Sequence, residues 1–296
     1  MIRGLYTAAS GMFALERRQA TLANNLANVQ TPGFKKDDSQ LRAFPNLLLS
    51  RVQNYKAKSS SAGETMGKAI PVGVPIGVLT TGVYAQERVP NFSQGQLLET
   101  NQPLDIAIND ENIPAQLING KLVKPAAFFA VQLPNGTVGY TRYGKFDLDA
   151  NNNLVTPEGY RLLGADHRPL QINEEISKDN FSVTADGQLI TNAKDPENTR
   201  VAGQIGMVVV DNPWELTKLG GNVYKFSNPI PFIQDAGQVN PGISLQQGYV
   251  EQSNVDAGQT MADMMTTVRN YTANQKVISA YDESLQKLNS TGSANQ

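Results

Sequence analysis

The stretch that decides the fold is residues 23–35, ANNLANVQTPGFK, in which a helical pattern breaks off at a proline and a glycine. Pro32 biases the preceding Thr31 away from the helical region, and Gly33 tolerates the turn beyond it. The stretch therefore predicts that an N-terminal helix ends near Val29 and that the chain then turns.

Apolar residues ahead of this break recur at alternating spacings of three and four, which is a heptad stripe. Charged and polar residues occupy most of the other positions, so one narrow seam of the predicted helix is apolar. The seam residues are Leu5, Ala8, Met12, Leu15, Gln19, Leu22, Leu26 and Val29.

The C-terminal region repeats the pattern and predicts a second helix. Its seam residues are Met261, Met264, Val268, Tyr271, Gln275, Ile278, Asp282 and Leu285. Each seam contains one glutamine, and a polar residue in an apolar seam can fix the register of a helix pair. We predict that Gln19 and Gln275 lie close together if the two helices pair antiparallel.

Both seams need partners. The six clearly apolar residues of the N-terminal seam are together worth on the order of 10 kcal/mol when buried, as an upper bound. A lone helix would leave that surface in water. Two interpretations remain open: the two ends of one chain pack on each other, or helices of many subunits complete one another.

Three asparagines, Asn24, Asn25 and Asn28, crowd the final turns of the first helix. Asparagine is a poor helix former, costing up to about 0.7 kcal/mol relative to alanine. The residues indicate either a solvated helix end or amides that hydrogen-bond to neighbouring subunits.

Between the two helices the hydrophobic period changes from 3.6 to 2, which predicts an all-β central domain. Asn135-Gly136 lies between two alternating runs and predicts a hairpin turn, and Asp186-Gly187 does the same further on. A short helix is expected over residues 211–216, with Trp214 as a core anchor.

The predicted fold class is α+β, a discontinuous helical coiled-coil domain from both termini with an inserted all-β domain. The predicted domains are the terminal helices, 1–30 and 255–296; an extended segment, 31–83; the central domain, 84–247; and a return linker, 248–254. The extended segment is rich in Ser, Gly, Pro and Lys and is expected to order only against other subunits.

Composition excludes several classes of function. The 296 residues include no Cys and one His, which excludes disulfides, thiolate zinc sites and multi-histidine metal sites. A net charge of −2 gives no electrostatic footprint for nucleic acid. No uncharged apolar run approaches the roughly 20 residues that cross a bilayer, so we expect no membrane insertion. The helical period also continues past Arg17 and Arg18, which is not expected of a cleavable signal peptide.

No catalytic constellation stands out. The pairs Asp110-Glu111 and Glu174-Glu175 are neighbours in sequence, whose side chains diverge, so we interpret them as solvated surface charge. His167 is typical of a turn residue. The sequence predicts no catalytic, cofactor-binding or metal-binding residue and no enzyme.

The quoted stretch, residues 23–35, resembles the N-terminal signature of flagellar rod and hook axial proteins. Residues 248–256, GYVEQSNVD, resemble the other end of that family. Segments between them also resemble it, namely residues 95–100, 103–108, 128–131, 140–144 and 219–224. Residues 109–127 depart from the family pattern by being longer. By this resemblance, the motif and subunit-contact residues are Asn24, Asn25, Asn28, Thr31, Pro32, Gly33, Phe34, Ser253 and Asn254.

The resemblance implies a structural subunit that polymerises with its own copies and with other rod and hook proteins, and that transmits torque from motor to hook. It implies passage through the flagellar export apparatus without a cleavable signal, and a location in the extracytoplasmic basal body. Residues 54–83 look like the extra segment of distal rod proteins, with proximal rod or hook as alternatives. A second hypothesis is a secreted β-domain binding module or hydrolase dimerised by its terminal helices.

Overall fold

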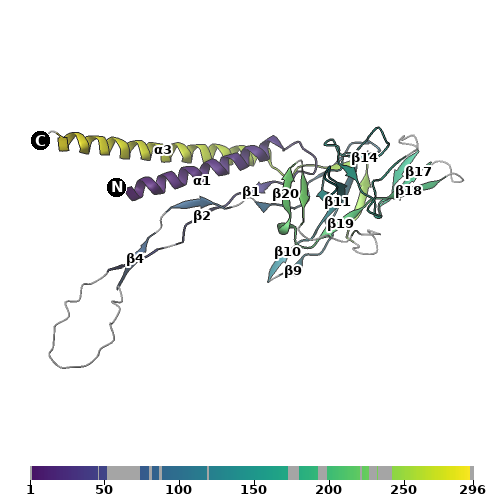
Figure 1. Cartoon of the computed structure of the whole chain (residues 1–296), viewed down its shortest axis with the longest axis horizontal. Coiled ribbons are helices and arrows are strands. Elements are labelled where there is room, and N and C mark those ends of the chain that lie inside the picture. Colours follow the sequence, from purple (N-terminus) through teal and green to yellow (C-terminus); the bar gives the residue numbers. More distant parts are fainter. Residues whose placement is uncertain are drawn as a thin grey trace, which may run out of the picture. The chain divides into compact units, whose positions relative to one another are not determined.

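The computed structural model describes residues 2–45, 47–51, 74–79, 82–86, 89–118, 120–172, 180–192, 199–220, 222–226, 232 and 242–293 (Figure 1). The described residues include two long helices, α1 (Ile2–Ala27) and α3 (Ala257–Ser293), a short 3-10 helix η1 (Pro213–Glu215), and strands joined by turns and loops. The predicted α+β class is confirmed.

The chain divides into two compact units. The helix unit comprises Met1–Leu22, Ser39–Arg88 and Ala262–Gln296. The β unit comprises Ala23–Asp38 and Val89–Met261.

Within the helix unit, α1 and α3 approach each other where α1 has glycines. A side-chain carbon on Gly4 would collide with the Tyr281 hydroxyl, and one on Gly11 would lie 3.0 Å from the Asn274 amide nitrogen. As the residue number increases along α1, the number of the facing residue on α3 decreases, so the two helices run antiparallel. The same register puts Gln19 about nine residues, or ~13 Å, from the position opposite Gln275. The predicted glutamine pair is wrong.

The seam of α3 is rotated by one residue from its predicted position. Of the predicted residues, Met264, Tyr271 and Ile278 are half-buried, whereas Met261, Val268, Gln275, Asp282 and Leu285 are exposed. The second protected row is formed instead by Thr260, Thr267, Asn274 and Tyr281. Gly4 and Gly11 of α1 leave room for Tyr281 and Asn274, which a count of apolar residues does not detect.

The predicted seam of α1 is protected throughout. Ala8 and Leu15 are buried, and the other members are half-buried, namely Leu5, Met12, Gln19, Leu22, Leu26 and Val29. Val29 lies beyond the last helical residue, Ala27.

The rest of the helix unit is a pair of two-stranded ladders. Strand β2 (Leu41–Ala43) pairs with β5 (Val83–Ala85), and β3 (Leu47–Arg51) pairs with β4 (Val74–Leu79), both antiparallel. The rings of Phe44 and Tyr84 lie 5.2 Å apart beside the first ladder. The Val83 N–H donates to Ser10 Oγ of α1, at 3.3 Å, so the ladder is joined to the helix.

The β unit contains one eight-stranded sheet, ordered β13-β14-β15-β11-β12-β21-β20, with β19 also paired to β11. Its strands are β11 (Ala126–Gln132), β12 (Val138–Thr141), β13 (Asp147–Leu148), β14 (Leu154–Val155), β15 (Arg161–Leu162), β19 (Met207–Val210), β20 (Thr217–Gly220) and β21 (Val223–Lys225). The hairpin predicted at Asn135-Gly136 joins β11 to β12, and Gly136 adopts a φ of 79° there.

Smaller sheets complete the unit, and three of them pair residues far apart in sequence. A three-stranded sheet consists of β16 (Phe181–Val183), β17 (Gln188–Thr191) and β18 (Arg200–Gln204). The two-stranded sheets are β1 (Asp37–Asp38) with β6 (Val89–Pro90), β7 (Leu97–Glu99) with β23 (Tyr249–Glu251), β8 (Ile106–Asn109) with β22 (Ser244–Gln247), and β9 (Gln116–Ile118) with β10 (Lys121–Val123).

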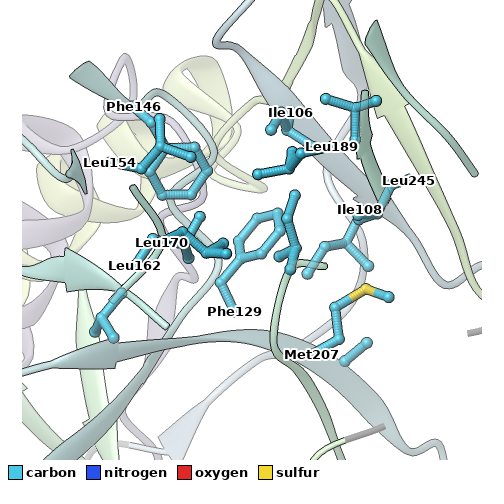
Figure 2. Packing of buried hydrophobic residues seen from close by; sticks show 14 of the residues in the cluster. Ile106, Ile108, Phe129, Phe146, Leu154, Leu162, Leu170, Leu189, Met207 and Leu245 are labelled. Atoms are coloured by element: carbon cyan, nitrogen blue, oxygen red, sulfur yellow. The ribbon is translucent and has the colours of Figure 1, made fainter. Parts of the chain in front are cut away.

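The hydrophobic core of the β unit surrounds Phe129 of β11 (Figure 2). Its ring meets that of Phe146 edge-on, with centroids 5.3 Å apart. Side chains from β8, β17, β19 and β22 pack into the same cluster. Trp214 is not part of this core: it is 52% exposed, because η1 buries Pro213 instead, so the expectation of a core anchor is wrong.

We predict that Phe129→Ala lowers the free energy of unfolding by about 3–5 kcal/mol, because the side chain is fully buried. Denaturant unfolding of the full chain measures the change. Val201→Ala, at a side chain that is 61% exposed, is the control and should change stability by less than about 0.5 kcal/mol. Equal effects of the two changes would contradict this account of the core.

Candidate functional site

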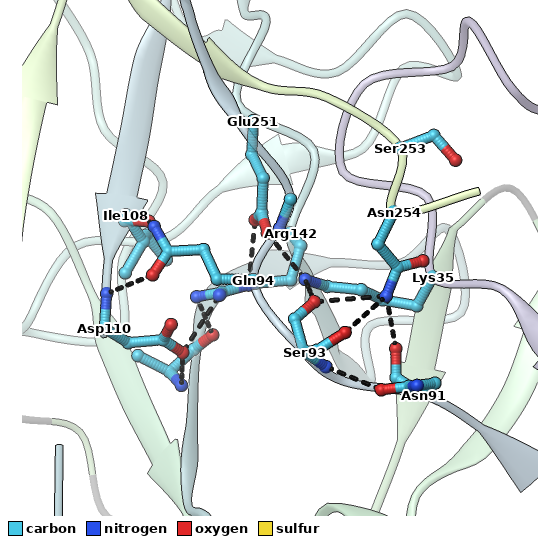
Figure 3. A network of polar contacts seen from close by, with 12 residues as sticks. Lys35, Asn91, Ser93, Gln94, Ile108, Asp110, Arg142, Glu251, Ser253 and Asn254 are labelled. Carbon is cyan, nitrogen blue, oxygen red and sulfur yellow. Dashed lines mark hydrogen bonds and ion pairs between the residues drawn. The ribbon is translucent and has the colours of Figure 1, made fainter. Parts of the chain in front are cut away.

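Four buried charged residues meet inside the β unit (Figure 3). Lys35 follows α1, Asp110 follows β8, Arg142 follows β12, and Glu251 ends β23. The side chains are at most 3% exposed. The site therefore joins both terminal segments of the chain to the central strands.

The first ion pair connects the two ends of the chain. Lys35 Nζ lies 2.5 Å from Glu251 Oε1, although 216 positions separate the residues in sequence. Lys35 Nζ also donates to the Ser93 carbonyl at 2.8 Å. The Gly95 N–H donates to the same Glu251 oxygen at 2.8 Å. Each charge thus has hydrogen-bond partners besides its counter-ion, as buried ions require.

Arg142 connects this pair to the second carboxylate. Its Nη2 lies 2.9 Å from Asp110 Oδ2 and its Nε lies 3.1 Å from Glu251 Oε2. Its Nη1 donates to the Ala127 carbonyl at 2.8 Å. Asp110 Oδ2 in turn accepts from the Ala127 N–H at 3.3 Å. The guanidinium is therefore held by one hydrogen bond to a backbone carbonyl and by ion pairs with two carboxylates.

The network contains two cations and two carboxylates, so its formal charge is zero. Burial would lower the pKa of Arg142, but the Glu251 and Asp110 carboxylates raise that pKa above its ordinary value. Burial, and after it the positive charge of Arg142, lower the pKa of Lys35 from 10.5 to about 8 against the opposing effect of Glu251. Of the two cations, Lys35 is the one whose pKa lies below its ordinary value.

Gly33 allows the N-terminal segment to reach this network. Its φ of 66° is one that side chains rarely adopt, and a side-chain carbon there would collide with the Arg142 carbonyl. The Gly33 N–H donates to the Glu251 carbonyl at 2.7 Å. The predicted turn after Pro32 is confirmed, and it places the backbone against both Arg142 and Glu251.

Phe34, the next predicted motif residue, is buried below Lys218. The ammonium of Lys218 lies 4.4 Å from the centre of the Phe34 ring, and it also pairs with Asp37 at 3.3 Å. The aromatic ring and the carboxylate therefore attach β20 to the segment that follows α1.

Asn25 and Asn254 use their amides within the chain. Asn25 donates to the Asp37 carbonyl and accepts from the Asp37 N–H, both at 2.9 Å. Asn254 accepts from the Lys36 N–H at 2.8 Å and donates to the Asn91 carbonyl at 2.8 Å. These bonds lie within one chain, and the subunit contacts of the two residues stay a prediction.

The remaining motif residues form local hydrogen bonds or lie at the surface. Asn28 donates to the Asn24 carbonyl at 2.9 Å, and Thr31 donates to Asn28 Oδ1 at 3.2 Å. Ser253 Oγ accepts from the Val255 N–H at 3.3 Å. Asn24 is exposed, so its subunit contact stays a prediction.

The sequence did not single out Asp110 and Arg142 as partners. Asp110 was expected to be solvated surface charge, and that expectation is wrong because the carboxylate is buried against Arg142. A usable signal was its position two residues after the apolar run 106–108, where a buried charge needs a counter-ion. The other proposed surface pair, Glu174-Glu175, lies outside the described residues.

The helices leave a second set of residues at the surface, and these are apolar. On α1, Tyr6 is 66% and Phe13 is 68% exposed. On α3, Met261, Met265 and Val268 are 50%, 58% and 40% exposed. Aromatic and methionine side chains spaced along helices in this way are typical of surfaces that another protein covers.

Chemical sites are not evident in the part of the chain that the structure describes. No cluster of three His, Cys, Asp or Glu side chains there could hold a metal ion. None of the described helices has the length and apolarity that a membrane span needs.

The segments that follow α1 and precede α3 are joined by buried contacts, and apolar side chains on both helices are exposed. These two features are typical of a protein that assembles with other subunits. The chain belongs to the flagellar basal-body rod and hook family. Family models match at residues 5–35 (flagella basal body rod protein), 122–191 (flagellar hook protein FlgE/F/G D1 domain) and 246–291 (flagellar basal body rod FlgEFG protein C-terminal).

Full-length relatives agree with these models. Flagellar hook-basal body complex protein FlhO of Bacillus subtilis (strain 168) is 37% identical over 287 residues, covering 97% of each chain. Flagellar basal-body rod protein FlgG of Buchnera aphidicola subsp. Baizongia pistaciae (strain Bp) is 35% identical, over 97% of this chain and 99% of the relative. FlgG of Bacillus subtilis (strain 168) is 31% identical, over 97% and 98%. The chain is a structural subunit of the flagellar rod.

We predict that Arg142→Met destabilises the chain by about 3–5 kcal/mol, because it leaves two buried carboxylates with a single cation. Arg161→Met is the control, since Arg161 pairs with Asp149 at an exposed position and should cost less than about 1 kcal/mol. Denaturant unfolding at neutral pH measures both. A cost below 1 kcal/mol for Arg142→Met would show that the network contributes little to stability.

Lys35 predicts a pH dependence with a defined sign. Its pKa is about 8 in the folded chain and ordinarily 10.5, so between these values the unfolded chain binds more protons. The free energy of unfolding should therefore rise with pH across this window. Below pH 8, Lys35 is protonated in both the folded and the unfolded chain, so the free energy of unfolding includes the whole unfavourable contribution of burying the ammonium. Lys35→Met has no titrating group at this position. The free energy of unfolding of the wild type minus that of this variant should therefore increase between pH 8 and 10.5. A constant value of this difference would contradict the prediction.

Proposed function

We propose that this rod subunit belongs to the distal rod and polymerises into a helical tube that transmits torque from motor to hook. The supporting observation is the row of apolar side chains left exposed on α1 and α3, described above. A filament grows through heterologous contacts, in which two different surfaces of the subunit meet and leave a free surface at each end. Exposed apolar side chains suit such contacts.

In this proposal, the terminal helices, residues 1–30 and 255–296, form a coiled coil that lines the inner tube. Residues 31–83 run along neighbouring subunits, residues 84–247 form the outer surface, and residues 248–254 return the chain to the second helix. The predicted seam residues Met261, Val268 and Leu285, which are exposed in the single chain, become buried against other copies.

Rod family proteins assemble with their own copies and with other rod and hook proteins. We extend this to the present chain, and we further propose that it reaches the flagellum through the flagellar export apparatus. The placement in the distal rod rests on residues 54–83, the extra segment described above.

The proposed open polymer is tested against a closed dimer held together by the terminal helices. A rod subunit predicts open assemblies that grow with concentration, whereas a closed oligomer keeps one size. Sedimentation of the full-length chain over a range of concentrations separates the two.

We predict that Phe13→Asp abolishes motility and assembly while the β unit keeps its stability, because Phe13 is two-thirds exposed in the single chain. Complementation of a strain that lacks this subunit measures motility, and thermal unfolding of the purified variant measures stability. Glu16→Gln, at a neighbouring exposed position, should behave as wild type. Normal swimming with Phe13→Asp would contradict the role of this helix face.

Basal bodies from the strain that lacks the subunit test its place in the rod. A distal subunit predicts particles that retain the inner part of the rod and lack the outer part and the hook. Particles without any rod would instead assign the chain to the proximal rod.

A further inference from the structure

The segment directly before α3, residues 243–255, runs through the interior of the β unit. Its buried apolar side chains, at most 8% exposed, are Ile243, Leu245, Val250 and Val255. Leu245 of β22 lies directly opposite Ile108 of β8, and its side chain is in the cluster around Phe129 (Figure 2). A late part of the chain thus supplies part of the core of the β unit.

The same segment pairs with two strands that are more than a hundred positions earlier in sequence. In sheets of two strands, β22 pairs with β8 and β23 pairs with β7. Between these pairs, the Gly248 N–H donates to the Asp105 carbonyl at 2.7 Å. The Gln247 side chain donates to the Pro103 carbonyl at 2.9 Å and accepts from the Val183 N–H at 3.0 Å. Without the segment, these backbone groups lose the partners that buried polar groups need.

Glu251 of this segment is also the counter-ion of two buried cations. It pairs with Lys35 and with Arg142, whose Nε lies 3.1 Å from Glu251 Oε2. In a chain that ends before Glu251, the two cations would share the single carboxylate of Asp110. A buried charge without a counter-ion is strongly destabilising.

These contributions are lost together when the segment is missing. Folded units are stable by a narrow margin, because their stability is a small difference between large opposing terms. Removal of residues 243–255 takes away four core side chains, the partners of two strands and a buried counter-ion, and each loss alone is destabilising. Strands close in sequence, such as β11 and β12, can still pair in such a chain, but the core around them is incomplete.

We propose that residues 243–255 act as a completeness check: the β unit folds only in a chain that has been synthesised as far as α3. Synthesis proceeds from the N-terminus, and α3 begins at Ala257, two residues beyond the segment. An incomplete chain therefore forms no folded β unit that lacks the second helix. Such a unit would end a growing tube, and in this last point alone the inference rests on the proposed function.

Native-state hydrogen exchange of the full-length chain tests the dependence. In increasing, sub-denaturing urea, the amides of β22 and β23 should open with the same free energy and urea dependence as those of β11. The reason is that the segment cannot leave while the rest stays folded. The edge strand β18, where Val201 is 61% exposed, is the control and should open more easily. Protection of β22 and β23 about tenfold or more below that of β11 would overturn the proposal.

Chains arrested during synthesis test the timing. A force-sensitive arrest sequence placed after the chain is released when the part outside the ribosome folds. Chains with residues 1–241 outside should give no release, and chains with residues 1–256 outside should give release. In the longer chain, Leu245→Asp should prevent release, because it places a charge in the core. Gln252→Asp, at an exposed side chain of the same segment, is the matched control and should retain release.

The outcomes separate this inference from the proposed function. Release from chains with only residues 1–241 outside would overturn the completeness check and leave the rod subunit role intact, since neither measurement involves a polymer. Release only when α3 is also outside would overturn the assignment of the check to residues 243–255. A full-length chain that forms no open assemblies in sedimentation would overturn the proposed function and leave the folding dependence unaffected.

Discussion

The buried contact between Arg142, Glu251, Asp110 and Lys35 is the constraint on which the β unit depends. Two cations and two carboxylates from four distant segments are removed from water together. Loss of any one member leaves an uncompensated charge in the interior, which costs more than an intact network contributes. The network is complete only when the segment after α1 and the strand before α3 are both in place.

This constraint suits a structural subunit better than a catalyst. The charges are fixed by backbone carbonyls and N–H groups rather than directed toward an open cavity. Neighbouring polar residues, including Asn25 and Asn254, close further hydrogen bonds between the same segments. The ends of the β unit are thus joined by short-range forces, as expected of a part that bears mechanical load in a rod.

The helices follow a different rule. Their protected faces include glycine, threonine, asparagine and tyrosine, and several of their most apolar side chains lie at the surface. A helix that is apolar on more than one face needs more than one partner. The rotated seam of α3 is therefore informative, because the residues that a heptad count assigns to one contact are divided between the partner within the chain and the surface left for others.

Sequence alone determined the element types, the break after α1 at Pro32-Gly33, the hairpin at Asn135-Gly136 and the family, because these depend on local backbone preferences and short motifs. Tertiary structure alone decided the partners: which face of α3 meets α1, that Asn25 bonds Asp37, and that Asp110 is buried against Arg142. The physical reason is that the sequence does not show whether a charged or amide side chain will interact with water or with another group of the protein. That depends on which segments meet in space, whether they lie 12 residues apart, as Asn25 and Asp37 do, or 216, as Lys35 and Glu251 do.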